Sequence, residues 1–144
     1  MKSSHNKAEL ENPVQTRIEY PNGSLYDEVY TISKKYPDFD AYIFMGRKTS
    51  YRAFIEKVHE CAKALKSIGV REGDSVTIAL PNCPQAIQVF YAVNIIGGIA
   101  NMIHPLASEN ETLFCLKEAD SRVVICLDSF YKKFENVKEK AFLR

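Results

Sequence analysis

The sequence predicts an α/β fold with three layers, in which a largely parallel sheet carries helices on both faces. Segments whose apolar residues recur at helical spacing alternate along the chain with short, nearly continuous apolar runs. Such alternation is typical of right-handed crossover connections between parallel strands. The chain has 144 residues, 46% of them hydrophobic and 26% charged, which suits the core of one ordinary globular domain.

The first predicted element is a helix that begins after Ser24. Ser24 followed by Asp27 has the pattern of a helix N-cap, and the apolar stripe after it ends before Tyr36. The start of the chain is polar and lacks the apolar core of a secretory signal. We therefore expect a flexible or extended leader over residues 1–23, followed by one α/β subdomain over residues 24–144.

A hairpin and a second helix follow. Residues 46–48 are the expected hairpin turn, because their glycine can take a positive φ between two short strand patterns. Thr49 or Ser50 then caps a helix whose apolar residues recur at three- and four-residue spacing until Gly69, a left-handed C-cap. We expect His59, on the polar side of this helix, to face solvent.

The strands of the parallel sheet are predicted at residues 75–80, 99–103 and 122–127. The first and the last are nearly continuous runs of apolar side chains, which is typical of strands covered on both faces. We therefore expect residues 75–80 to form an internal strand and residues 122–127 to form another strand of the buried type.

Two helices connect these strands. One begins at Asn82 or Pro84 and ends at the Gly97-Gly98 pair, and Asn82 is interpreted as its cap. The other is capped by Ser108 and has an acidic first turn, which complements the helix dipole. Cys83 gains thiolate character at a helix N-terminus, but a catalytic thiol needs a histidine partner, and none is predicted nearby.

A last amphipathic helix begins at Asp128 or Ser129. Its lysines, within residues 132–140, are interleaved with glutamates at helical spacing, which favours a solvated helix face over a nucleic-acid contact. The chain stops at Arg144 inside this helical pattern. We interpret that end as a cut in a longer protein, with a frayed natural terminus as the alternative.

Charge and cysteine content exclude several classes of function. The 19 basic and 18 acidic residues leave a formal charge of +1, so we expect no nucleic-acid partner. No C-x-x-C pair and no histidine at ligand spacing accompanies the cysteines, so we expect no metal site. The four cysteines are Cys61, Cys83, Cys115 and Cys126. All but Cys83 lie among apolar neighbours in periodic segments, as reduced cysteines do, which favours a cytoplasmic location.

Residues 85–103 carry no charged side chain, and their number is close to the roughly 20 residues that span a bilayer. A transmembrane helix is therefore an alternative for this stretch. Polar residues within it, and the Gly97-Gly98 pair that would break the helix, argue against that alternative. We predict two buried elements joined by a glycine turn and no transmembrane segment.

Short motifs fall in a recognisable register, although each one alone is only a turn or cap signal. They are Thr49-Ser50-Tyr51, residues 64–76, Leu80-Pro81-Asn82-Cys83-Pro84, Gly97-Gly98-Ile99-Ala100 and His104-Pro105-Leu106. In order and spacing they resemble the N-terminal part of AMP-forming acyl-CoA synthetases, which are adenylate-forming enzymes. Residues 20–22 and 129–133 look like the long-chain fatty-acyl-CoA ligase branch of this family.

The resemblance implies an enzyme that activates a carboxylic acid, here a fatty acid, with ATP and Mg²⁺ to an acyl-adenylate. The thiol of coenzyme A, or of a carrier protein in some related enzymes, then displaces AMP. The family's phosphate loop, nucleotide contacts and catalytic lysine lie in later segments, and this chain has neither G-x-x-x-x-G-K nor G-x-G-x-x-G. We expect an inactive N-terminal subdomain, truncated before the ATP-binding loop, with no catalytic residue and no bound cofactor.

The resemblance assigns binding residues only at His104, Pro105 and Leu106. In related synthetases this neighbourhood lies near the approach of coenzyme A, and open α/β sheets gather ligands where their strands end. The family commonly has asparagine at the position of His104, so a purely structural turn residue is the alternative.

Two other classes of function stay open at this point. One is an autonomous α/β module that binds a nucleotide or a phosphate without catalysis, and the other is a membrane or scaffold protein. The oligomeric state and the chain length of the acid substrate are not predicted.

Overall fold

The computed structural model describes residues 22–143. The elements are α1 (Leu25–Lys35), β1 (Asp40–Phe44), β2 (Arg47–Ser50), α2 (Tyr51–Ser67), β3 (Ser75–Ala79), α3 (Pro84–Ile96), β4 (Ile99–Met102), α4 (Glu109–Glu118), β5 (Val123–Cys126), the 3₁₀ turn η1 (Asp128–Phe130) and α5 (Tyr131–Val137). The predicted leader falls almost wholly outside the described residues.

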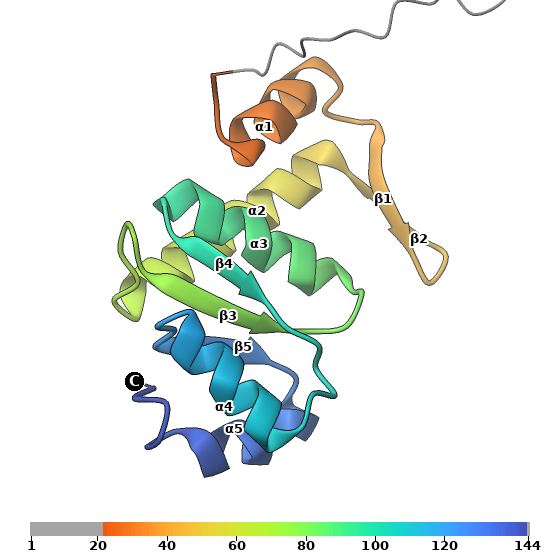
Figure 1. Cartoon of the computed structure of the whole chain (residues 1–144). Helices are drawn as coiled ribbons and strands as arrows, with labels where there is room; N and C mark the ends of the chain where they lie inside the picture. Colours follow the sequence, from red (N-terminus) through yellow and green to blue (C-terminus); the bar gives the residue numbers. More distant parts are fainter. Residues whose placement is uncertain (1–21, 144) are drawn as a thin grey trace, which may run out of the picture.

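The three-layer α/β fold is confirmed. Figure 1 shows the sheet of β4, β3 and β5 with α2 and α3 on one face and α4 and α5 on the other. Strand β3 is central and pairs in parallel with both neighbours, so that Ile78 lies opposite Met102 on one side and Ile125 on the other. Helix α1 and the β1–β2 hairpin lie at the outer side of α2.

The apolar side chains of β3 alternate between two cores. Val76 and Ile78 are fully buried against α2 and α3, and Ala79 is fully buried with Leu116 of α4 on the opposite face. Burial of each such aliphatic side chain contributes roughly 1.5–3 kcal/mol. Coverage on both faces is therefore the physical reason for the nearly continuous apolar sequence of β3.

Helix boundaries follow the predicted caps. Ser24 and Ser108 each form a capping box with the acidic residue three positions later, and the Ser50 side chain accepts a hydrogen bond from the Ala53 backbone N–H at 3.3 Å. Gly97 ends α3 in the left-handed conformation, with φ of 79°. These interactions are local in sequence, which explains why they were predictable.

The hairpin turn differs from the prediction. It consists of Met45 and Gly46, with φ of 48° and 77°, while Arg47 and Lys48 already belong to β2. Two-residue turns with positive φ at both positions match the right-handed twist of the flanking strands. The pairing of β1 with β2 thus begins directly after Gly46.

Two predicted helix caps differ from the structure. Helix α3 begins at Pro84, one of its two predicted starts, but its N-cap is Cys83 and not Asn82, and Cys83 makes no side-chain cap bond. Pro84 occupies the first turn, where its fixed φ suits a helix and its missing N–H needs no partner. Asp128 and Ser129 lie in η1, and α5 begins only after this turn.

Strand β5 is less buried than its sequence predicts. All four of its residues are half-buried, because β5 pairs only with β3 among the described residues and leaves its other edge open. The uncharged stretch over residues 85–103 forms α3, the Gly97-Gly98 turn and β4, as expected. Within residues 22–143, no helix is long and apolar enough to cross a membrane.

Candidate functional site

A groove of about 610 Å³ lies at the carboxyl end of the sheet. The ends of all three parallel strands contribute to it, together with the loop after β4 and the η1 turn. Because the chain runs from β3 to β4 and then crosses to β5, the strand order reverses next to β3, and ligands of open α/β sheets bind at such switch points. The lining residues are Leu80, Pro81, Asn82, Met102, Ile103, His104, Pro105, Leu106, Leu127 and Phe130.

The groove includes all the site residues predicted from sequence. His104 and Leu106 are exposed, whereas Pro105 between them is buried. The Nδ1 atom of His104 accepts a hydrogen bond from the Leu106 backbone N–H at 3.2 Å, and the His104 carbonyl accepts one from the Ala107 N–H at 3.1 Å. His104 therefore organises its own turn and also presents an imidazole to the groove.

The polar groups of the groove are few. Asn82 supplies an amide and His104 an imidazole, while the remaining lining residues are apolar. Because Nδ1 of His104 is an acceptor, the neutral ring carries its proton on Nε2 and can donate there. Among residues 22–143, no carboxylate, lysine or arginine side chain lines the groove. Such a surface suits an elongated, uncharged ligand with amide or carbonyl groups.

Nucleophilic chemistry has no support in the described part of the chain. Cys83 caps α3 close to the groove, but within residues 22–143 no hydrogen bond joins its thiol to a histidine. The hydroxyl of Tyr26 does contact Nε2 of His59 at 2.6 Å, at the α1–α2 contact. Loss of solvent raises the pKa of Tyr26, so this phenol stays protonated and packs rather than reacts.

The described residues do not fit a magnesium site. Over residues 22–143, no group of three or more histidine, cysteine, aspartate or glutamate side chains lies close enough to hold a metal ion. The cysteines are all free thiols, and burial raises the pKa of Cys61 and Cys126, which disfavours their thiolates. We therefore assign no metal-binding role to these side chains.

A buried polar network crosses the sheet beneath α4. Ser121 Oγ lies 2.8 Å from both Ser75 Oγ and Thr77 Oγ1, and the Asn101 amide donates to Thr77 Oγ1 at 2.9 Å. These groups satisfy one another, with no acid or base among them. The network joins β3 and β4 to the turn before β5, so we assign it a structural role.

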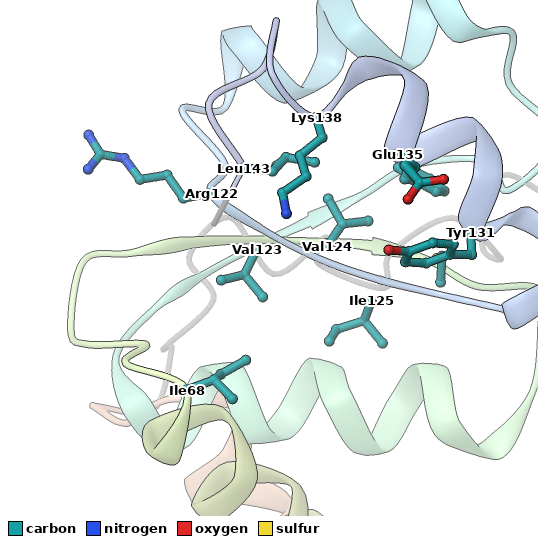
Figure 2. Close-up of a pocket in the computed structure, with 11 residues that line it drawn as sticks. Ile68, Arg122, Val123, Val124, Ile125, Tyr131, Glu135, Lys138 and Leu143 are labelled. Carbon is teal, nitrogen blue, oxygen red and sulfur yellow. The ribbon is translucent and has the colours of Figure 1, made fainter.

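A second groove, of about 390 Å³, follows the open edge of β5 (Figure 2). Val124 lines it on the side of α5, where Glu135 also lies, and Val123 and Ile125 line it on the opposite face of β5, toward Ile68. Figure 2 shows Arg122 pointing away from the groove. The charged side chains that line this groove, Arg122, Glu135 and Lys138, do not converge on a common point. We therefore assign no chemical role to this groove.

Sequence reasoning missed several groups near the first groove. Leu127 and Phe130 were assigned to a strand end and a helix, yet both line the groove. Lys133 was assigned to a solvated helix face, but it is half-buried and bonds to the loop after β4. Phe130 and Lys133 lie in the 129–133 motif, but that motif does not indicate a contact with the groove, because the partners of Lys133 are more than 20 positions away in the chain.

Comparisons with known proteins agree with this architecture. The family model described as AMP-binding enzyme matches residues 30–143. A long-chain-fatty-acid–CoA ligase of Bacillus subtilis (strain 168) is 31% identical over 131 residues, which are 91% of this chain and 23% of the relative. Acetyl-coenzyme A synthetase 1 of Candida albicans is 30% identical over 146 residues, covering 89% of this chain and 22% of the relative. The chain thus spans less than a quarter of these relatives.

Solved structures share the fold. A long-chain-fatty-acid-CoA ligase from Archaeoglobus fulgidus superposes with a TM-score of 0.81 at 21% identity, covering 88% of this chain and 27% of that one. The inhibitor-bound N-terminal domain of a Mycobacterium tuberculosis protein, FACL13, superposes with a TM-score of 0.75 at 21% identity, covering 80% and 29%. The family match and the identity to the curated relatives confirm the resemblance seen in the sequence: the chain belongs to the AMP-binding enzyme family, which includes acyl- and acetyl-CoA ligases.

Proposed function

We propose that this chain is the N-terminal part of an AMP-forming acid–thiol ligase that acts on a fatty acid. The whole enzyme joins the acid to AMP from ATP, with release of pyrophosphate, and then transfers the acyl group to the thiol of coenzyme A. The observation that carries the proposal is 31% identity over 91% of the chain to a long-chain-fatty-acid–CoA ligase. Acetyl-CoA synthetases match at similar identity, so the length of the acid is the part most in need of a test.

The role that we propose for this segment is to support a site completed elsewhere in the protein. Charge that develops on phosphate oxygens needs cations and N–H donors aimed at it. The first groove has no cationic side chain in its lining, and residues 22–143 hold no cluster of metal ligands. We therefore place the ATP and Mg²⁺ sites in the rest of the protein and derive no step through them here.

For the groove we propose contact with coenzyme A through its neutral pantetheine arm. The arm is an elongated chain with two amides, and the groove offers an apolar lining with two polar side chains. Nε2–H of His104 can donate to an amide carbonyl, and the Asn82 amide can both donate and accept. His104, Pro105 and Leu106 are the proposed binding residues, with no catalytic residue in this segment.

The proposal is tested first on the intact protein. Thioester formation is measured with ATP, coenzyme A and either acetate, octanoate or palmitate as the acid. We expect AMP and pyrophosphate in equal amounts, with kcat/KM higher for the longer acids than for acetate. A preference for acetate would contradict the fatty-acid assignment, and no thioester with any acid would contradict the reaction class.

The second test uses the 144-residue chain alone. We expect no ATP–pyrophosphate exchange, because residues 22–143 hold no cluster of metal ligands and we place the groups that stabilise adenylation elsewhere in the protein. Calorimetry with ATP, AMP and coenzyme A separates this proposal from an autonomous nucleotide-binding module. Micromolar affinity for ATP or AMP would favour the module. We also propose a cytoplasmic location, supported by the four free cysteines.

A further inference from the structure

Lys133 joins α5 to the loop that follows β4. Its ammonium donates hydrogen bonds to the carbonyl oxygens of Pro105 at 2.7 Å and of Ala107 at 2.9 Å. The two acceptors belong to the same short loop, so one charged group binds the loop at two points. Hydrogen bonds from a charged donor are stronger than neutral ones, and two of them from one atom fix the loop in position as well as in orientation.

Aromatic rings complete the surroundings of this ammonium. It lies 5.0 Å from the ring centroid of Phe134, which is buried, and 5.5 Å from that of Phe130, which lines the first groove. Cations are attracted to aromatic faces, most strongly where water is excluded. Lys133 is half-buried, in contrast to its exposed neighbour Lys132. Its charge therefore serves an internal contact.

Besides the burial of Pro105, the loop has few anchors to the rest of the fold other than Lys133. At its start, the Ile103 N–H donates to the Ile78 carbonyl at 3.2 Å, and at its end Ser108 caps α4. Between these points the bonds of His104 to Leu106 and Ala107 are internal to the loop. Such bonds shape the turn without placing it relative to the sheet, and Lys133 supplies that placement.

We propose that Lys133 is a positioning residue of the candidate site, which sets where His104 and Leu106 stand in the groove. It does not line the groove, so it acts through the loop and not by contact with the ligand. The ligand part of this inference rests on the proposed function, in which the groove receives the pantetheine arm of coenzyme A. The structural part stands on the bonds of Lys133 alone.

The structural part is tested by hydrogen exchange and mass spectrometry on the intact protein. Lys133→Met keeps the aliphatic stem and removes the charge, and Lys132→Met is the matched control on the same helix. We expect hydrogen exchange in peptides covering residues 103–108 to be at least about tenfold faster in Lys133→Met than in wild type. Exchange in peptides from β3 should be the same in both. Unchanged exchange in this segment would overturn the proposal, as would an equal effect of Lys132→Met.

The functional part is tested by separating the two half-reactions. We expect Lys133→Met to raise the KM for coenzyme A by about tenfold, while ATP–pyrophosphate exchange stays within about twofold, because a displaced loop misplaces only the thiol substrate. Lys133→Arg, whose guanidinium can reach both carbonyls, should restore most of the affinity. Faster exchange at residues 103–108 with an unchanged KM would overturn the positioning role.

Failure of the proposed function is distinguishable from failure of this inference. If the wild-type protein forms no thioester, the proposed function fails while hydrogen exchange still decides whether Lys133 holds the loop.

If Lys133→Met does not fold, Lys133→Gln, which can donate to one carbonyl, takes its place. An intermediate increase in exchange for Lys133→Gln supports the proposal, and wild-type exchange contradicts it.

Discussion

The hydroxyl of Tyr26 in α1 lies 2.6 Å from Nε2 of His59 in α2, and the two residues are 33 positions apart. Tyr30 stacks on Tyr26 with ring centroids 5.5 Å apart, and the Tyr26 backbone N–H donates to the Asn94 side chain at 3.1 Å. The sequence-based prediction that His59 faces solvent is therefore wrong. This polar contact docks α1 against both α2 and α3.

We expect Tyr26→Phe to lower the free energy of unfolding by about 1 kcal/mol, because a half-buried histidine nitrogen loses its partner while the ring packing is kept. Urea denaturation measures this difference. Tyr36→Phe is the control, since Tyr36 also stacks on an aromatic ring, Phe39, at 5.2 Å, and no bond to its hydroxyl is seen within residues 22–143. Equal stability of both variants would contradict the docking role of the hydroxyl.

Stability at acidic pH should depend on Glu111. Hydrogen bonds from the Ser108 backbone N–H, and then from its hydroxyl, hold the pKa of Glu111 below its ordinary value. A folded-state pKa below that of the unfolded chain means that the stabilisation is present above about pH 4.3 and is lost as the pH falls through the folded value. We expect Glu111→Gln to lower the urea concentration at the midpoint of unfolding at neutral pH. Between about pH 5 and pH 3, this midpoint should fall less steeply in the variant than in wild type.

Urea titrations at several pH values check this prediction. Glu118→Gln removes an exposed carboxylate from the other end of α4 and serves as the control, with no loss of stability at neutral pH expected. An identical acid profile for wild type and Glu111→Gln would show that the capping carboxylate is not responsible.

Two buried hydroxyls should respond to removal in opposite ways. Ser121→Ala takes away the group that meets both Ser75 and Thr77 in the buried network, so we expect a loss of about 1–3 kcal/mol. Thr112 is fully buried in α4, and its hydroxyl has no hydrogen-bond partner within the described residues. Thr112→Val should therefore be neutral or stabilising, because it removes a buried polar group that gains nothing in the folded state.

Thermal unfolding of the two variants checks the pair. A clear loss of stability in Thr112→Val would mean that its hydroxyl has a partner, such as a buried water molecule. No loss in Ser121→Ala would mean that Ser75 and Thr77 find other partners and that the network does not hold the sheet together.

The close approach of two turns predicts a steric requirement at Gly98. A Cβ atom there would lie 2.9 Å from the Asp74 carbonyl oxygen and 3.1 Å from Cγ1 of Val93, so we expect Gly98→Ala to cost about 1–3 kcal/mol through overpacking. Gly73→Ala is the matched comparison, since its Cβ would meet no atom within 4 Å although φ is +80°. Its backbone strain should cost about 1 kcal/mol.

Chemical denaturation of both glycine variants measures the difference. If Gly98→Ala is as stable as wild type, the turns after α2 and α3 can separate without loss, and their packing does not define the amino-terminal end of the sheet. If Gly73→Ala loses more stability than Gly98→Ala, the strain of a left-handed backbone at Gly73 costs more than the steric overlap at Gly98.

Part of the lining of the candidate site was predictable from sequence. His104, Pro105 and Leu106 were predicted from the family resemblance and from their place after a strand, and all three line the groove at the carboxyl end of the sheet. Lys133 and Phe130 could not be assigned in this way. Their contribution depends on a crossover that returns the chain to the far side of β3.

The sequence by itself determined which elements form and several of their limits. Capping pairs such as Ser108 with Glu111, the stop at Gly97, and apolar periodicity act over three or four residues, so they can be identified without knowledge of the fold. Only the tertiary structure decided the strand order β4–β3–β5, the open edge of β5, and the contacts of His59 and Lys133. These features join residues far apart in the chain. The contacts between them stabilise the fold only after packing has brought the partners together, so no short stretch of sequence predicts them.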